Sequence, residues 1–160
     1  MVEELLEDLV DYDVQIISGL AFGIDIHAHK ISLDKKIPTV AVLGTGFENL
    51  HPAVHRKIAT EMELNGGIVT EFLGNAIVDA SNFPKRNRIV AGISEATVVV
   101  ESADKGGSMI TARLAMDYNR DVFAFPGNAD KFSSAGCNSL IKSNKVMLIT
   151  SAEDVIKTMA

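Results

Sequence analysis

Six short runs of aliphatic and β-branched residues, separated by stretches of helical character, most strongly constrain the fold of this chain. The runs cover residues 14–17, 38–43, 68–70, 96–101, 122–125 and 146–149. They read as continuous apolar runs rather than as apolar and polar residues in alternation, which is typical of strands in a sheet covered on both faces. The sequence therefore predicts an α/β protein with a mostly parallel sheet of about six strands and helices on both faces.

The helices are predicted between these runs from apolar periodicity and capping residues. They are expected at residues 3–12, 24–34, 53–65, from Pro84 onward, at 108–119, at 137–143 and after residue 150. A glycine pair at 66–67 is predicted to end the third helix. Thr150 or Ser151 is predicted to cap the last helix, with Asp154 in its first turn. A chain of 160 residues suits one domain with a sizeable core.

Charge is unevenly distributed along a chain whose net charge is −6. Residues 1–13 hold six acidic side chains and no basic one, whereas the remaining 147 residues hold 15 of each sign. A local basic site can therefore dominate the field around it. No apolar run approaches the ~18 residues of a membrane span, and the acidic start does not resemble a signal peptide. Cys137 is the only cysteine, which excludes an internal disulfide and fits a reducing, cytoplasmic setting.

Glycine-rich turns follow four of the predicted strands. They are Ser18-Gly19, Gly44-Thr45-Gly46, Gly106-Gly107-Ser108 and Pro126-Gly127-Asn128. Ligands of parallel sheets bind beyond the carboxyl ends of the strands, where backbone N–H groups can cradle a phosphate. Glycine is also common in turns without any ligand. Four such turns on one predicted edge of a sheet nevertheless favour an anion site there.

A basic segment, Phe83 to Val90, is the second indication of an anion site. It places Lys85, Arg86 and Arg88 within four residues, directly after Phe83-Pro84. Because proline favours the first turn of a helix, these cations are predicted to lie on a first turn, where helix stability alone would favour acids instead. We interpret the segment as a phosphate site rather than as an ordinary solvated face.

Catalytic and cofactor sites are poorly supported. The glycine turns lack the spacing of a dinucleotide fingerprint, and no Walker-type Gly-Lys-Ser/Thr exists, so no cofactor is predicted. His27 and His29 fall on different faces of one helix, a poor metal chelate. All four histidines are interpreted as surface or capping residues, and Asp25 as a residue stabilised by the helix dipole. We predict no catalytic residue and no metal ligand.

Five segments match the motifs of one known family in chain order. Residues 18–25 read Ser-Gly-Leu-Ala-Phe-Gly-Ile-Asp, and residues 83–92 read Phe-Pro-Lys-Arg-Asn-Arg-Ile-Val-Ala-Gly. Residues 107–113 are similar to a Gly-Ser-Leu-Ile-Thr-Ala segment, and residues 122–127 and 136–141 complete the match. Together they resemble the DNA-processing protein A family (DprA/Smf) over about residues 14–150.

The resemblance implies a three-layer Rossmann-like fold, with residues 1–160 forming a single DNA-processing domain. It implies a non-enzymatic protein that binds and protects incoming single-stranded DNA and helps to load the RecA recombinase in natural transformation. It also implies a homodimer formed through the C-terminal part of this domain, with Met109, Ile110 and Leu140 as contributors. No membrane partner is implied.

The site residues implied by the resemblance fall on the two features described above. The basic DNA-binding segment corresponds to Lys85, Arg86, Asn87 and Arg88. Phe83 would stack on a base or pack in the core. The phosphate pocket corresponds to Ser18, Gly19, Gly44, Gly46, Gly106, Gly107 and Ser108.

The chain departs from the family pattern in two respects. The family usually has arginine at the position of Phe22, so one cationic phosphate contact is expected to be missing. The family's sheet also begins upstream with a strand followed by Gly-Ser-Arg, and further N- and C-terminal domains flank it. We therefore expect this chain to be a truncated form with an incomplete site and an unpaired strand edge.

Two other functions use the same type of sheet. A nucleotide phosphoribohydrolase of the lysine-decarboxylase-like type carries the motif Pro-Gly-Gly-x-Gly-Thr-x-x-Glu. Residues 105–111 match this motif only in part. Ala112, Arg113 and Leu114 stand where that enzyme needs an acid. A small-molecule nucleotide sensor is the third hypothesis. Salt-dependent DNA binding, release of free base from nucleotides, and calorimetry with nucleotides distinguish the three.

Overall fold

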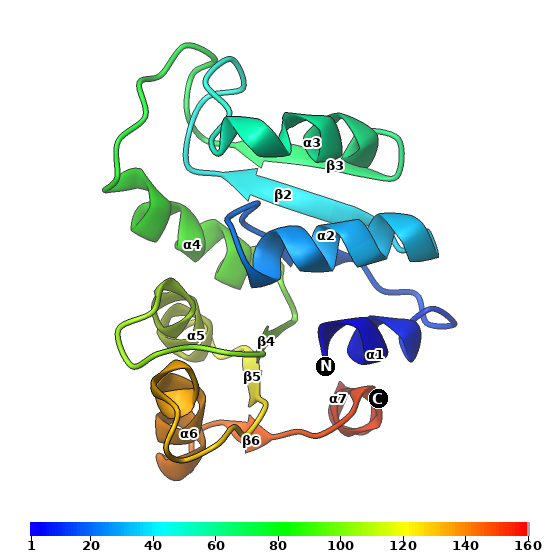
Figure 1. Cartoon of the computed structure of the whole chain (residues 1–160), viewed down its shortest axis with the longest axis vertical. Helices are drawn as coiled ribbons and strands as arrows, with labels where there is room; N and C mark the ends of the chain where they lie inside the picture. Colours follow the sequence, from blue (N-terminus) through cyan, green and yellow to red (C-terminus); the bar gives the residue numbers. More distant parts are fainter. Residues whose placement is uncertain (160) are drawn as a thin grey trace. The chain divides into compact units, whose positions relative to one another are not determined.

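The computed structural model describes residues 1–159 and divides into two compact units (Figure 1). The N-terminal unit comprises Val2–Arg86, and the C-terminal unit comprises the residues from Asn87 onward together with Met1. Each unit contains its own parallel sheet and its own helices. Across residues 1–159, no helix combines the length and the apolar character needed to span a bilayer.

The N-terminal unit has a three-stranded parallel sheet in the order β1-β2-β3. Its elements are α1 (Val2–Glu7), β1 (Ile16–Ser18), α2 (Ile24–Lys35), β2 (Thr39–Leu43), η1 (Ala53–His55), α3 (Arg56–Met62) and β3 (Gly66–Thr70). Helices α2 and α3 pack beside each other on this sheet (Figure 1). Their apolar side chains form a core with the strands that includes Leu20, Leu43 and Met62.

The C-terminal unit has a second three-stranded parallel sheet in the order β4-β5-β6. Its elements are β4 (Ala96–Val99), α5 (Gly107–Asp117), β5 (Asp121–Ala124), η2 (Phe132–Ser134), α6 (Ala135–Lys142), β6 (Met147–Leu148) and α7 (Ala152–Met159). Helix α4 (Asn82–Ile93) begins in the N-terminal unit and ends in this one. Val99, Met109 and Leu140 belong to the core of the C-terminal unit.

The predicted α/β class and the parallel strands are confirmed, but the single sheet of about six strands is wrong. The described residues form two sheets of three strands, and β1 and β4 each have one paired neighbour. Strand β1 has only three residues, and all of them pair with β2. The alternation of strands and helices indicates how many strands a chain has, but it does not indicate which strands share hydrogen bonds.

Several element boundaries differ from prediction. Helix α4 begins at Asn82, so Lys85 is its fourth residue rather than a residue of the first turn after Pro84. The Asn82 N–H donates to the Asp79 carbonyl (3.0 Å), and the Asp79 carboxylate accepts the Ser81 N–H (2.7 Å). That hydrogen bond lowers the pKa of Asp79. An anionic side chain therefore already serves the start of α4, and the cations lie further along the helix.

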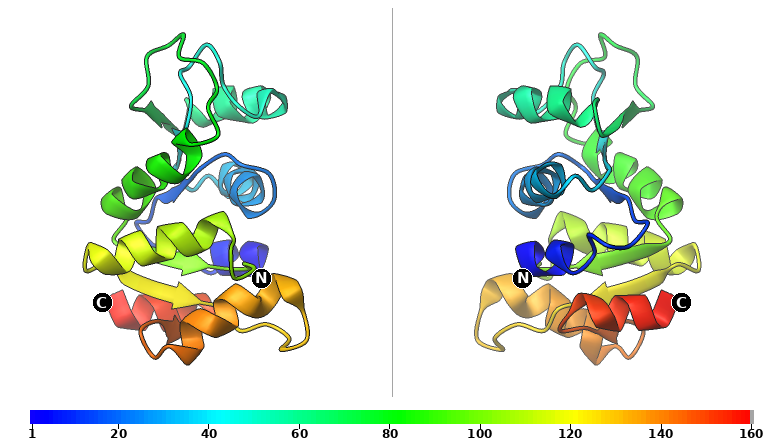
Figure 2. Two further views of the ribbon diagram at one scale, coloured as in Figure 1. Left: turned by 90° about the vertical axis from the view of Figure 1, so that its left-hand side faces the viewer. Right: turned by 90° about the vertical axis from the view of Figure 1, so that its right-hand side faces the viewer.

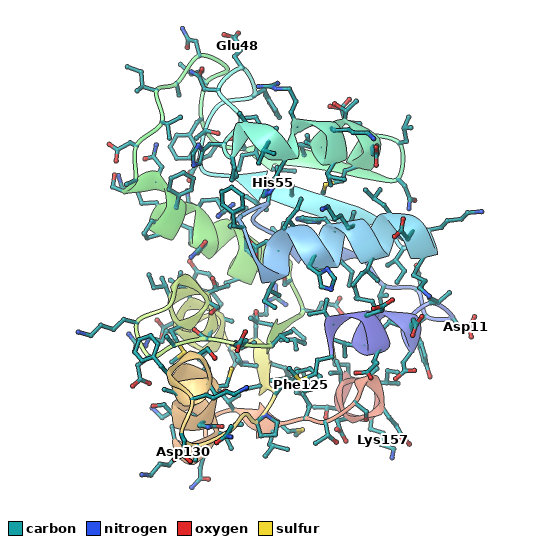
Figure 3. All side chains as sticks on the ribbon, in the orientation of Figure 1. Asp11, Glu48, His55, Phe125, Asp130 and Lys157 are labelled. Atoms are coloured by element: carbon teal, nitrogen blue, oxygen red, sulfur yellow. The ribbon has the colours of Figure 1, made fainter. Side chains whose placement is uncertain are left out.

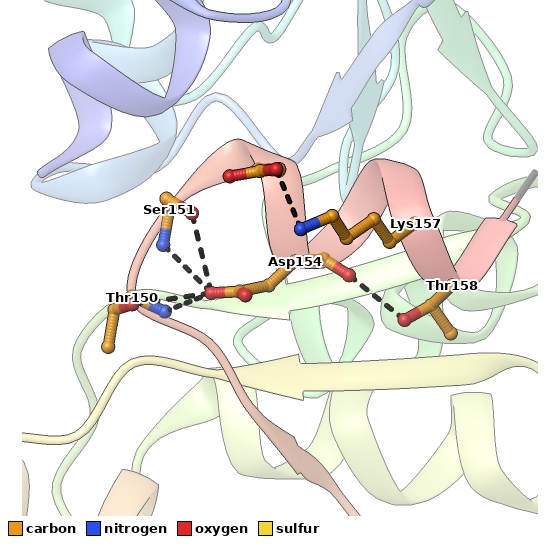
Figure 4. Close-up of polar contacts among 6 residues, drawn as sticks. Thr150, Ser151, Asp154, Lys157 and Thr158 are labelled. Atoms are coloured by element: carbon orange, nitrogen blue, oxygen red, sulfur yellow. Dashed lines mark hydrogen bonds and ion pairs between the residues drawn. The ribbon is translucent and has the colours of Figure 1, made fainter.

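The last helix is capped in the opposite sense from the prediction (Figure 4). The side chain of Asp154 reaches back and accepts the backbone N–H groups of Thr150 (2.8 Å) and Ser151 (3.2 Å). These two hydrogen bonds lower the pKa of the Asp154 carboxyl. Thr150 and Ser151 therefore act as donors to Asp154 rather than as caps that accept from the helix.

Two loops of the N-terminal unit are joined by hydrogen bonds and lie side by side in Figure 2. One follows β2 and the other connects β3 with α4. The Glu48 N–H donates to the Gly74 carbonyl (2.9 Å), and the Asn49 amide donates to the Ala76 carbonyl (2.9 Å). These hydrogen bonds fix the loop that follows β2 against the loop between β3 and α4.

Candidate nucleic-acid interface

The cations of α4 divide between surface and interior. Lys85 and Arg88 are exposed and three residues apart, which places them on the same side of the helix. Arg86 lies on a different side and is only 4% exposed. Two of the three predicted phosphate ligands can therefore meet solvent anions directly, whereas the third is enclosed.

The guanidinium of Arg86 joins the carboxyl ends of two neighbouring strands. Its Nη1 donates to the carbonyl of Gly19 (2.7 Å) and also to the carbonyl of Val42. Burial lowers the pKa of Arg86 and the nearby Asp25 carboxylate raises it, but a guanidinium remains charged inside proteins. Arg86 thus supports the turn after β1, and its predicted contact with DNA stays a prediction.

The turn after β1 is held from its other side by Asp25. One oxygen of this carboxylate accepts the N–H groups of Gly19 (3.1 Å) and Ala21 (3.2 Å). Between them Leu20 is fully buried and has a positive φ of 61°. An added Cβ on Gly19 would lie 2.5 Å from Nη2 of Arg86, so packing already requires glycine there. Ser18, the half-buried last residue of β1, precedes this turn.

The turn after β2 is covered by an aromatic ring. A Cβ on Gly44 would lie 2.7 Å from Cδ1 of Phe83, so the Phe83 ring packs directly on this glycine. Phe83 is half-buried, and the exposed His51 lies beside it with ring centroids 5.7 Å apart and an interplanar angle of 49°. Gly46 is buried against the backbone carbonyls of the neighbouring loop. Phe83 therefore packs in part and leaves the rest of its surface exposed to solvent.

Two of the histidines are buried, which corrects their interpretation as surface or capping residues. His55 is 7% exposed and lies between α3 and the loop that opens α2 (Figure 3). Its Nδ1 donates to the carbonyl of Leu20 (2.8 Å), because a carbonyl can only accept. The edge-on ring of Phe22 lies against it, with centroids 4.8 Å apart and an interplanar angle of 67°.

His29 is fully buried on α2 and its tautomer follows from its partner. The Thr39 hydroxyl donates its one proton to the Ile16 carbonyl (3.0 Å), so it accepts from Nδ1–H of His29 (2.7 Å). Nε2 is then unprotonated, and it has no hydrogen-bond partner within residues 1–159. Because burial penalises the charged ring, the pKa of His29 is lowered to about 4. His27 is exposed, so the predicted placement of the two histidines on different faces is confirmed.

The C-terminal unit contributes a more open glycine turn at the start of α5. The Asn87 side chain donates to the Gly107 carbonyl (3.3 Å), which links α4 to this turn. Gly106 occupies the N-cap position of α5 and packs on the side chain of Ser102. A Cβ on Gly107, by contrast, would meet no atom within 4 Å. The half-buried Ser108 follows as the second residue of α5.

The three residues implied in a dimer interface have different environments. Met109 and Leu140 are 4% and 5% exposed and belong to the core of the C-terminal unit, so packing already accounts for them. Ile110 is 36% exposed. Cys137 is buried, and burial raises the pKa of its thiol. The predicted dimer itself is not tested by these positions.

The structure brings together some of the predicted residues and adds others. It joins Gly19 with Arg86, Gly44 with Phe83, and Asn87 with Gly107. No group of three or more His, Cys, Asp or Glu side chains that could hold a metal ion occurs among the residues described. Sequence reasoning missed the aromatic pairs of Phe22 with His55 and of His51 with Phe83. The available signal was an aromatic residue inside a glycine turn and two histidines that flank a turn.

Comparison with known proteins shows the family and the fold of this chain. A family model described as DNA recombination-mediator protein A matches residues 1–160. Protein Smf of Escherichia coli (strain K12) is 41% identical over 154 residues, which are 96% of this chain and 41% of that protein. DNA processing protein DprA of Streptococcus pneumoniae (strain ATCC BAA-255 / R6) is 36% identical over 155 residues, or 97% of this chain and 54% of that protein.

Two solved structures have the same fold. The X-ray structure of DprA from Streptococcus pneumoniae superposes with a TM-score of 0.89 at 35% identity, over 98% of this chain and 54% of that one. A DprA structure from Helicobacter pylori, described for its single-stranded DNA binding mode, gives 0.87 at 28% identity over 99% of this chain and 71% of that one. This chain spans about half or less of the length of the curated relatives named above. The predicted resemblance is confirmed over the whole sequence, and the chain belongs to the DNA recombination-mediator protein A family.

Proposed function

We propose that this chain binds the sugar-phosphate backbone of single-stranded DNA without catalysing a reaction on it. The phosphates would contact the exposed cations of α4, and a base would use the remaining surface of Phe83. Within the C-terminal unit, the open backbone at the start of α5 is a further candidate phosphate contact. Support comes from the family membership and from the Helicobacter pylori relative, whose structure is described for its single-stranded DNA binding mode.

The observation that carries the proposal is the pair of exposed cations, Lys85 and Arg88, on one side of α4. Two cations on one side of a helix can neutralise phosphates of one strand, and phosphate contacts supply a large share of the affinity in such complexes. Arg86 contributes indirectly, because it fixes the Gly19 turn through backbone carbonyls. Asn87 contributes in the same way at Gly107.

The test is a titration of fluorescently labelled oligothymidylate at several salt concentrations. Affinity is expected to fall with rising salt, and the slope of log affinity against log salt should decrease by about 0.7 for each phosphate that the protein no longer neutralises. The double variant Lys85→Ala/Arg88→Ala should therefore bind more weakly and with a slope smaller by about 1.4. Lys57→Ala is the matched control, because Lys57 is a highly exposed cation on α3.

Three results would contradict the proposal. They are salt-independent binding, an equal loss of affinity in the Lys57→Ala control, and absence of binding by the unsubstituted chain. Thermal unfolding of the double variant should match that of the unsubstituted chain, since both side chains are exposed. A loss of affinity with unchanged unfolding then reports on DNA binding alone.

We also propose that the bound strand is passed to the RecA recombinase in the cytoplasm, by a homodimer of the whole protein. The family description, a recombination mediator, supports the first step. The exposed Ile110 is the one residue among the three candidates that a partner can reach. Light scattering of the whole protein tests the dimer. The transfer is tested by comparing the rate of RecA filament assembly on single-stranded DNA that carries this chain with the rate on the same DNA without it. A monomer, or an unchanged assembly rate, would contradict the respective step.

A further inference from the structure

We propose that Phe22 is a second stacking platform, which receives an unpaired nucleobase of the bound strand. This inference rests on the proposed function and adds to it the position of a base. Phe22 lies in the turn after β1 and is 70% exposed. Exposed aromatic rings serve as stacking platforms for unpaired bases in proteins that bind single strands.

The Phe22 ring is held in place before any ligand arrives. Its edge contact with His55 is fixed because Nδ1 of His55 donates to the Leu20 carbonyl at 2.8 Å. The backbone before Phe22 is fixed by Asp25, which accepts the N–H groups of Gly19 and Ala21. A ring that is already ordered loses little conformational entropy on binding, so stacking there retains most of its free energy.

The surroundings of Phe22 favour a flat ligand. Its chain neighbours Ala21 and Gly23 are small and exposed, so a planar group can approach without meeting a bulky side chain. The contact with His55 is edge-on, with an interplanar angle of 67°, so the two rings are not stacked face to face. The exposed part of the Phe22 ring can therefore receive a planar base.

A second aromatic pair on the same short segment supports a nucleic-acid strand as the ligand. His51 pairs with Phe83 and His55 pairs with Phe22, and the two histidines are four positions apart in the sequence. Four residues of chain span at most about 14 Å. Both pairs belong to the N-terminal unit, where they lie at the turns that follow β1 and β2. One strand can therefore place different bases at the two pairs.

The experiment uses oligothymidylate that carries a single 2-aminopurine, whose fluorescence is quenched when it stacks. The unsubstituted chain, Phe22→Ala, Phe22→Leu and Phe22→Tyr are compared, with Phe132→Ala as the control because Phe132 is 80% exposed in the C-terminal unit. Phe22→Ala is expected to weaken binding roughly 5- to 150-fold and to reduce the quenching, since Phe83 remains as a stacking partner. The salt slope should not change, because the same phosphates remain neutralised. Phe22→Tyr should keep affinity, and Phe22→Leu should not restore it.

The outcomes separate this inference from the function on which it rests. If the unsubstituted chain does not bind the oligonucleotide, the proposed function fails and this inference fails with it. If it binds, and Lys85→Ala/Arg88→Ala weakens binding while Phe22→Ala does not, only the stacking platform is overturned. Full affinity in Phe22→Leu would also overturn it, because an apolar cover rather than a π-face would then suffice.

Discussion

Glycine turns follow strands in both units, but their packing differs between the two. In the N-terminal unit, Gly19 lies under the Arg86 guanidinium and Gly44 lies under the Phe83 ring. In the C-terminal unit, Gly107 is exposed and has space where a side chain would go. The first two glycines are required by packing inside the unit. The third has no such requirement, so its open backbone leaves room for the phosphate contact that we propose there.

This difference shows that a glycine turn can support a binding surface without touching the ligand. The N-terminal turns are fixed by the buried Arg86 and His55 and by the half-buried Asp25. Phe22 at these turns is exposed and Phe83 is half-buried. The C-terminal turn is held by the Gly106 N–H, which donates to the Ala103 carbonyl (2.9 Å), and by the Asn87 side chain, which donates to the Gly107 carbonyl (3.3 Å). We expect the N-terminal unit to be sensitive to substitution and pH at its turns, and the C-terminal unit to tolerate changes at Gly107.

The largest expected effect is that of Arg86→Met. Methionine fills part of the volume but leaves the carbonyls of Gly19 and Val42 buried without their charged donor, which should cost about 3–5 kcal/mol of unfolding free energy. Urea unfolding followed by circular dichroism measures it. Arg88→Met is the matched control on the same helix, and its exposed side chain should change stability by no more than about 0.5 kcal/mol. Equal losses in the two variants would remove the distinction between buried and exposed arginine.

Acid should destabilise the N-terminal unit through His29. Its pKa is about 4 when folded and near 6.5 when unfolded, so the unfolded chain binds more protons between these values. Stability from this group is fully present above pH 6.5 and is lost as pH falls toward 4, by about 3 kcal/mol in total. Asp25, His55 and Arg86 are the charged or titratable groups that act on the ring. Urea midpoints from pH 4 to 7 measure the slope.

Two variants assign this pH dependence to its group. His29→Gln should flatten the slope between pH 4 and 6.5, whereas His27→Gln should leave it unchanged because His27 is exposed on the same helix. All four histidines of the chain precede residue 86, so histidine protonation acts within the N-terminal unit. Hydrogen exchange at pH 5 should accordingly rise in that unit first. A uniform rise in both units would contradict the assignment.

The sequence predicted the elements better than it predicted the environment of each side chain. Apolar runs located the six strands to within a few residues, because that signal is local. The first helix was predicted to reach residue 12 but ends at Glu7, and the short helix η2 (Phe132–Ser134) was not predicted. The burial of Arg86 was not predictable, since Arg86 and Arg88 are both cations on one helix and only the fold decides which side faces the strands. Likewise, the burial of His29 depends on Thr39, ten residues away on β2.

The third expected effect tests the packing at the N-terminal turns directly. Gly19→Ala places a Cβ within 2.5–2.7 Å of the Arg86 guanidinium, whose hydrogen bonds prevent it from moving away without loss. Overpacking of this kind costs about 1–3 kcal/mol. Urea unfolding measures the loss, and DNA affinity should fall in parallel because the turn that carries Phe22 is displaced. An unchanged unfolding midpoint would show that Arg86 adapts, and would weaken the role given to it.

The smallest expected effect on stability is that of Gly107→Ala, and it is opposite in sign to the effect of Gly19→Ala. A Cβ on Gly107 meets no atom within 4 Å, and the residue is the first of helix α5, where alanine is the better helix former. Gly107→Ala should therefore raise the unfolding free energy by up to about 1 kcal/mol. If a DNA phosphate approaches this backbone, the added methyl group should nevertheless weaken oligothymidylate binding. The two measurements then move in opposite directions, which a structural glycine cannot produce. A loss of stability in Gly107→Ala would place this glycine with Gly19, as a residue required by packing rather than by the ligand.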